Sequence, residues 1–293
     1  MKRWLAVLLA LVMVLSLFTL TACGEKDTDK QGEGQEQTDG NGDAGDAGNA
    51  GGEKEPVKTT YETVEEAAKK TGELKAVDAT IKGELKSSAN GEEMGYTAEL
   101  AIKGATKEDK PVVGGTLKLT VMGEEVAMEA YYEDGYAYLV MDGEGVKVAL
   151  PLDELGGAAD SFEKPEGLPE FDLKALLNKS TITKGADGKS VVKIALELKD
   201  VQATVDALIA EIEKMMGSEL GAKLTAKQFD VELALVDGYL AGVTLKAQVE
   251  ADVEGEVGTI TLNLDIALNN LGQDVTITPP AGYETFVETE MGL

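Results

Sequence analysis

The side chains that most often carry enzyme chemistry are nearly absent from this chain. It has no histidine, its single cysteine is Cys23, and its only arginine and tryptophan, Arg3 and Trp4, precede that cysteine. A Ser-His-Asp site, a Cys-His site and a zinc site built on imidazole are therefore excluded. Carboxylate pairs and Ser-Lys pairs remain, but acidic residues spread along alternating patterns are typical of a solvated surface. We expect no enzyme, no catalytic residue and no cofactor.

A calcium loop is the one metal site that the acidic spacing suggests. Residues 39–50 carry Asp or Asn at the first, third and fifth positions of a twelve-residue loop. Ala44 stands where the turn glycine belongs, however, and Ala50 stands where the bidentate glutamate belongs. We therefore expect no metal.

Cys23 ends a segment with the pattern of an export signal. Lys2 and Arg3 give it a positive start, residues 4–20 are largely apolar, and Leu20-Thr21-Ala22-Cys23 closes it with small residues. This segment resembles the lipobox of bacterial lipoproteins. The resemblance implies that residues 1–22 are a signal peptide that is cut off, and that the Cys23 thiol carries a diacylglycerol, often with a further acyl chain such as palmitate on the new amino terminus.

A transmembrane anchor is the alternative interpretation of the same segment. Such a span needs about 20 apolar residues and is seldom followed at once by a polar tract, as this one is. Two or three acyl chains on one cysteine also hold a protein firmly, whereas one chain does so only marginally. We therefore expect a lipid-anchored protein on the extracytoplasmic face of the cell membrane, at a Gram-positive cell surface.

Residues 23–58 predict a disordered acidic tether beyond the lipidated cysteine. They consist mainly of Gly, Asp, Glu, Asn, Gln and Lys, and such a composition cannot bury enough apolar surface to offset its ordering entropy. A flexible chain of this length averages ~33 Å end to end. The domain that follows, residues 59–293, should thus lie close to the bilayer.

The net charge narrows the range of partners. It is −27 for the whole chain and becomes −29 when Lys2 and Arg3 leave with the signal peptide. Such a surface is repelled by nucleic acid and by anionic headgroups. A cationic protein or wall polymer stays open as a partner, and we expect a monomer.

Residues 59–103 contain the clearest structural signals. Thr63-Val64-Glu65-Glu66 predicts the start of a short helix, which Gly72 ends. Two alternating apolar patterns then flank Asn90-Gly91, which predicts a hairpin. A two-residue loop would place Leu85 opposite Tyr96, Ile81 opposite Leu100 and Ala79 opposite Ile102, so that the apolar sides coincide.

Two later hairpins contain Asp134-Gly135-Tyr136 and Asp237-Gly238-Tyr239. In the second, a two-residue turn would set Leu233 and Leu235 on the side of Gly242 and Thr244. A three-residue loop would instead pair Leu235 with Tyr239. We predict this bulged form for both hairpins, which places Tyr132 on one face with Tyr136 and Tyr138.

The remaining patterns complete an α+β fold. Further strands are expected at 116–122, 146–150, 180–185, 190–198 and 256–270, with an edge strand at 275–278. Helices are expected at 172–178 and 200–216. We predict a single large curved antiparallel sheet, a half-barrel of roughly eleven strands, with a few helices covering the concave face.

The order of these features resembles that of uncharacterised Gram-positive surface lipoproteins. It comprises a lipobox, an acidic tether, about eleven strands with a central helical insert, the segment at 131–139 and the closing Thr-Pro-Pro-Ala-Gly-Tyr at 278–283. Those proteins are similar to the lipoprotein-carrier (LolA) and LprG/LppX-like superfamily. The resemblance implies a curved antiparallel half-barrel whose helices leave an apolar cavity for acyl chains. It implies no catalytic residue.

Methionines and isoleucines are the candidates for lining such a cavity, because thioethers suit an adaptable apolar pocket. The candidate lining residues are Met122, Met128, Met141, Ile209, Ile212, Met215 and Met216. An ordinary core between sheet and helix would use the same residues. Tyr131, Tyr132, Tyr136 and Tyr138 could stack on a wall sugar or simply stabilise the sheet.

Two classes of function follow from these patterns. The first is a non-catalytic lipoprotein that binds a lipid or another hydrophobic ligand under the sheet. The alternative is a surface interaction or envelope-sensing module with a solid core, which binds a protein or a cell-wall polymer.

Overall fold

The computed structural model describes residues 59–108, 110–150, 172–185, 188–216, 221–253 and 255–289. The predicted signal peptide, the lipid site at Cys23 and the tether all lie outside these ranges. Within them, no helix combines the length and the apolar character needed to cross a bilayer.

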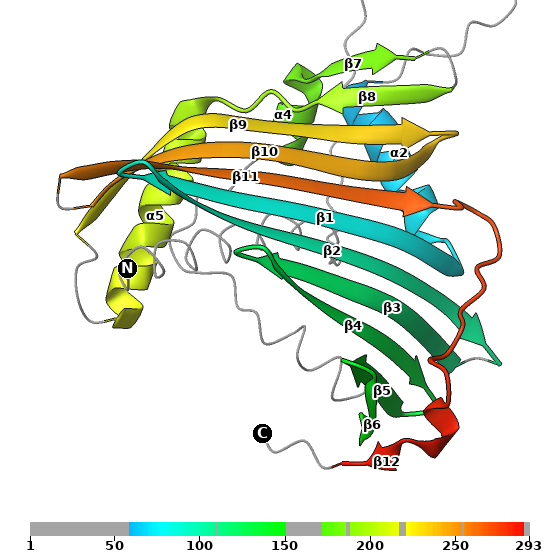
Figure 1. The fold of residues 1–293 in the computed structure, drawn as a ribbon. Coiled ribbons are helices and arrows are strands. Elements are labelled where there is room, and N and C mark those ends of the chain that lie inside the picture. Colours follow the sequence, from blue (N-terminus) through cyan, green and yellow to red (C-terminus); the bar gives the residue numbers. More distant parts are fainter. Residues whose placement is uncertain are drawn as a thin grey trace, which may run out of the picture.

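One twelve-stranded sheet organises the described residues (Figure 1). Its spatial order is β12-β6-β5-β4-β3-β2-β1-β11-β10-β9-β8-β7. The strands are β1 (Ala76–Ala89), β2 (Glu92–Lys107), β3 (Lys110–Val121), β4 (Glu124–Glu133), β5 (Tyr136–Met141), β6 (Glu144–Ala149), β7 (Thr181–Lys184), β8 (Lys189–Lys193), β9 (Ala222–Val236), β10 (Tyr239–Val253), β11 (Glu256–Asn269) and β12 (Val287–Glu288). All neighbours are antiparallel except β12 and β6, which are parallel. The predicted fold class is confirmed, with β1 and β11 joining its two halves.

In the described part of the chain, three α-helices accompany the sheet: α2 (Thr60–Gly72), α4 (Leu173–Lys179) and α5 (Leu198–Met216). The last two agree with the predicted ranges to within two residues. The start of α2 was predicted four residues too late, because Thr59 and Glu62 form the capping box instead of Thr63 and Glu66. Both pairs have the Thr-x-x-Glu spacing, so the sequence pattern alone does not choose between them.

The Asn90-Gly91 hairpin has the predicted register. Leu85 lies opposite Tyr96, Ile81 opposite Leu100 and Ala79 opposite Ile102. Both turn residues have positive φ, 54° and 80°, as the two-residue turn that matches strand twist requires.

The bulged form predicted for the two Asp-Gly hairpins is wrong. Both are two-residue turns in which the aspartate and the glycine have positive φ, which aspartate tolerates better than most residues. Leu235 lies opposite Leu240 and not opposite Tyr239, and a β-bulge between Leu240 and Gly242 then shifts the register so that Leu233 lies opposite Val243. The apolar faces therefore match through the bulge, and a longer loop is not needed.

The first Asp-Gly hairpin contains no bulge. Tyr132 therefore lies opposite Ala137, and Tyr131 lies opposite Tyr138. The prediction that Tyr132 shares a face with Tyr136 and Tyr138 is consequently wrong, because shortening the loop by one residue moves every side chain of the second strand to the other face.

The carboxyl-terminal segment also departs from the prediction. Residues 275–278 form no strand, and the additional strand is β12. The segment reaches the far edge of the sheet by packing on two glycines. A Cβ on Gly114 would lie 2.8 Å from Ile277 Cγ2, and one on Gly145 would collide with the Phe286 ring. These glycines allow residues 277–286 to lie directly on the sheet.

Candidate ligand-binding face

One face of the sheet carries an apolar row that crosses ten strands. The strand registers align one side chain from each of β5, β4, β3, β2, β1, β11, β10, β9, β8 and β7 in this order: Met141, Met128, Leu117, Leu100, Ile81, Ile266, Val243, Leu233, Val192 and Ile182. Because side chains alternate along a strand, the residues two positions away share this face. We call it the apolar face.

The helices bury one part of the apolar face. Val201 and Val205 of α5 pack with Leu245 and Ile260 in the larger buried cluster. A second cluster joins α2 and α4 to the sheet through residues such as Leu177 and Val192. In both clusters the buried strand residues come only from β1 and β8 to β11.

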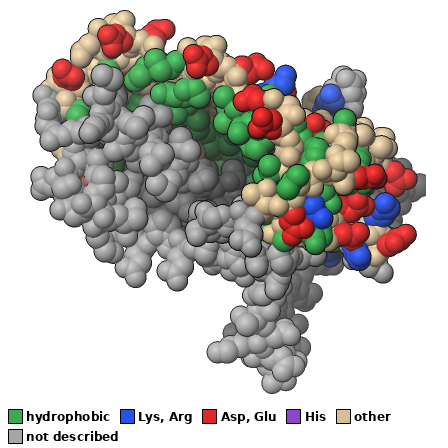
Figure 2. Space-filling model, turned by 60° about the horizontal axis from the view of Figure 1, so that its bottom comes forward, with side chains coloured by type: hydrophobic (Ala, Val, Ile, Leu, Met, Phe, Trp, Pro, Cys, Tyr) green, Lys and Arg blue, Asp and Glu red, His purple; other side chains and the backbone are tan. Residues whose placement is uncertain are grey.

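The other part of the apolar face, on β3 to β6, is more open. Its exposed apolar side chains are Val113 (36%), Val121 (43%), Val126 (45%), Met141 (53%) and Val146 (38%). Full burial of such a side chain contributes ~1.5–3 kcal/mol, so this surface leaves much of that free energy unused. In Figure 2, hydrophobic side chains gather along a hollow of the surface, and Asp and Glu side chains lie on part of its rim.

Two glycines of the apolar face have no described residue packed over them. Gly83 of β1 lies opposite Ala98 and Leu264, and Gly104 of β2 lies opposite Val77 and Val113. Apart from the glycine and its two chain neighbours, no atom of the described residues lies within 4 Å of a Cβ built on either glycine. Neither glycine was among the predicted site residues, although a glycine within an alternating strand pattern is a known signal for a close approach or for missing packing.

The seven predicted lining residues lie in different places. Met128 and Met141 face each other across β4 and β5 on the apolar face. Ile209 is partly buried against the larger cluster. Met122 occupies the β3–β4 turn with a φ of 53° and is 73% exposed. The side chains of the remaining three, Ile212, Met215 and Met216, lie outside the described part of the chain, and the lining role of the set stays a prediction.

Three of the four tyrosines, Tyr131, Tyr136 and Tyr138, share the face opposite the apolar face, and Tyr132 lies on the apolar face. Tyr131 is buried on the face opposite the apolar face, where its ring contacts Tyr138 and Tyr283, and Tyr138 also contacts Phe286. The Tyr131 hydroxyl donates to Glu133 at 2.9 Å. The pKa of Tyr131 is raised well above its usual value, mainly because the hydroxyl is buried and secondly because of this hydrogen bond. These contacts stabilise the sheet and the carboxyl-terminal segment, and binding of a sugar by the tyrosines stays a prediction.

The face opposite the apolar face carries a shallow polar groove of about 630 Å³. Lys82 pairs there with Glu99 at 3.3 Å. Thr244 donates to Asp265. Hydrogen bonds from Lys86 and, to a lesser extent, from Asn263 lower the pKa of the Glu84 carboxyl group. Because these polar groups largely satisfy one another, we interpret the groove as an ordinary solvated surface. Among the described residues, no three His, Cys, Asp or Glu side chains are grouped as a metal site would require.

No protein-family model matches the chain. No curated protein is similar to it in sequence. The solved structures that match include LprF from Mycobacterium bovis, with 16% identity, 76% of this chain and 97% of that chain covered, and a TM-score of 0.37. They also include the LolA superfamily protein NE2245 from Nitrosomonas europaea, with 10% identity, 73% and 96% coverage, and a TM-score of 0.20.

A DUF1329 family protein from Desulfovibrio piger matches with 8% identity, 76% and 96% coverage, and a TM-score of 0.23. The LolA superfamily, named in the resemblance above, is thus represented among the matched folds. At these identities and TM-scores the matches carry no conclusion about a ligand.

Proposed function

We propose that this chain is a non-catalytic, membrane-anchored lipoprotein that binds a lipid or another hydrophobic ligand on its apolar face. The observation that carries the proposal is the space in front of Gly83 and Gly104 that no described residue fills, next to exposed apolar side chains on β3 to β6. A hydrophobic ligand there would remove apolar surface from water, which favours binding by about 25 cal/mol per Å² before the cost of association.

The anchor belongs to the same proposal and rests on the sequence around Cys23 alone. Lipid on Cys23 and a tether of ~33 Å would keep the apolar face within reach of membrane lipids. Replacing the cysteine, Cys23→Ala, should move the protein from the membrane fraction to the soluble fraction of cells. Unchanged membrane retention would contradict the anchor and leave the ligand proposal standing.

The experiment for ligand binding fills the space over the apolar face with a larger side chain on the sheet itself. Gly83→Leu projects a side chain into the open space over the apolar face. Gly95→Leu is the matched control, since Gly95 also lies in a strand with no atom within 4 Å of its Cβ, but on the opposite face beside Lys86. Both substitutions remove the same backbone freedom from the unfolded chain.

Membranes carrying the full anchored chain would be treated with a fatty acyl probe that bears a diazirine group. Light should crosslink the probe to wild type and to Gly95→Leu, and at least several-fold less to Gly83→Leu. Equal labelling of all three chains, or labelling that maps to the face opposite the apolar face, would refute the proposal.

A further inference from the structure

The Tyr132 hydroxyl is a buried hydrogen-bond donor that has no partner among the residues that the structure describes. Its residue is 8% exposed, and the hydroxyl oxygen has no hydrogen bond within the described residues. Most buried polar side-chain atoms in folded proteins do have a partner. The neighbouring Tyr131, on the other face of the same strand, finds one in Glu133. The difference calls for an acceptor outside the described chain.

Tyr132 lies on the apolar face. It stands between Val113 of β3 and Ala137 of β5, and beyond Val113 lies Gly104 with its open space. On the other side, Ala137 is followed by the buried Val148. The strand neighbours of this hydroxyl are therefore apolar, and none of these described neighbours offers it a side-chain acceptor on the apolar face.

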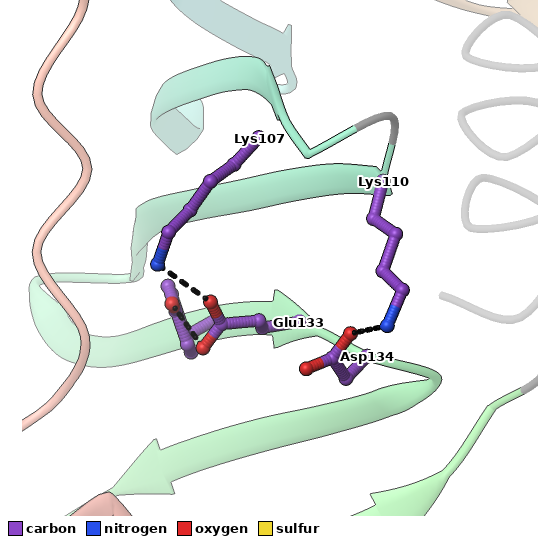
Figure 3. A network of polar contacts seen from close by, with 5 residues as sticks. Lys107, Lys110, Glu133 and Asp134 are labelled. Atoms are coloured by element: carbon purple, nitrogen blue, oxygen red, sulfur yellow. Dashed lines mark hydrogen bonds and ion pairs between the residues drawn. The ribbon is translucent and has the colours of Figure 1, made fainter.

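The charges at this end of the sheet restrict the chemistry of that acceptor. Lys107 pairs with Glu133 at 3.4 Å, and Lys110 pairs with Asp134 at 2.6 Å (Figure 3). Lys107, Lys110 and Glu133 each stand an odd number of positions from Gly104, Val113 and Tyr132 on their strands, so they project from the face opposite the apolar face. An anionic headgroup on the apolar face would therefore find no partner in these two lysines and would also meet the field of a chain with a net charge of −27. A neutral oxygen needs only the phenol.

We propose that the Tyr132 hydroxyl donates a hydrogen bond to a neutral oxygen, an ester or amide carbonyl, of an amphiphile bound on the apolar face; this inference rests on the proposed function. The hydrocarbon part of the amphiphile then follows β4 along Ala130, Met128 and Val126, which share the face of Tyr132. From Tyr132 to Val126 this path measures roughly 20 Å at about 3.3 Å per residue.

The test compares two probes on membranes that carry the full anchored chain. One is a diazirine-bearing alkyl methyl ester, and the other is the alkane of the same length with the same diazirine. The readout is the probe concentration that gives half-maximal crosslinking. The variants are Tyr132→Phe and the matched control Tyr131→Phe, and comparing variants on one membrane cancels the partitioning of each probe.

The compared quantity is the ratio of the ester concentration to the alkane concentration at half-maximal crosslinking. This ratio should be about 2- to 12-fold lower for wild type and Tyr131→Phe than for Tyr132→Phe, because one hydrogen bond contributes a factor of that size to binding. An ester-to-alkane ratio that Tyr132→Phe leaves unchanged would overturn the inference while the proposed function stands. If neither probe crosslinks to the wild-type apolar face, the proposed function fails and this inference fails with it.

Discussion

Tyr131 and Tyr132 are adjacent on β4 but lie on opposite faces of the sheet. We predict that removing the hydroxyl group lowers the free energy of unfolding at Tyr131 and does not lower it at Tyr132. Tyr131→Phe removes a hydrogen bond to the Glu133 carboxylate. Since the Glu133 side chain is 23% exposed and also pairs with Lys107, water and the lysine compensate in part, and we expect a loss of about 1–2 kcal/mol in the free energy of unfolding. Tyr132→Phe removes a buried hydroxyl that has no partner. We expect no loss, and a gain of up to about 1 kcal/mol, in the ligand-free chain.

Urea unfolding of ligand-stripped protein, followed by circular dichroism, would measure both variants against wild type. The slope against urea should stay unchanged, so that a shift in midpoint reports stability alone. A Tyr132→Phe chain as destabilised as Tyr131→Phe would show that the Tyr132 hydroxyl has a partner in the folded protein. That result would refute the reasoning behind the proposed ligand contact.

Three further predictions test other parts of the structure. Gly145→Val should expel the Phe286 ring from its seat and cost about 1–3 kcal/mol, with faster cleavage after residue 280 in limited proteolysis; unchanged cleavage would contradict the packing. Met122→Asn should raise the midpoint of thermal unfolding, because asparagine tolerates the φ of 53° better than methionine does; a lower midpoint would contradict this. The raised pKa of Tyr131 means that above pH ~10 the unfolded chain loses a proton that the folded chain keeps, so stability falls as pH rises further. Tyr131→Phe should weaken this fall, as measured by urea midpoints from pH 9 to 11, and an identical slope would contradict it.

The amino-acid pattern predicts the sheet well where local signals agree. Alternation on both sides of Asn90-Gly91 determines the register from Ala79 to Ile102, because only one register brings the two apolar sides together. The same logic failed at Asp237-Gly238. There the sheet corrects the register with a bulge near Ala241, and a bulge is chosen by packing over the whole sheet, which local residue types do not encode.

The candidate site was less predictable than the fold. Met128 and Met141 were expected on an apolar surface and lie on the apolar face. Tyr132, in contrast, was predicted on the face of Tyr138, because the turn between these two tyrosines was predicted one residue too long. The open space over Gly83 depends on how far the helices extend across the sheet. How far the helices extend is determined by tertiary packing. Helical periodicity in residues 200–216 indicates which side of that helix packs on the sheet, but it does not indicate which part of the sheet the helix leaves uncovered.

Native mass spectrometry of the full acylated chain, released from membranes in a mild detergent, tests the central claim most directly. We predict a non-covalent adduct above the mass of the acylated protein that dissociates on collisional activation as a neutral amphiphile. It should be present in wild type and Gly95→Leu and largely lost in Gly83→Leu. A wild-type spectrum without any such adduct, or equal adducts in all three chains, would contradict a ligand on the apolar face.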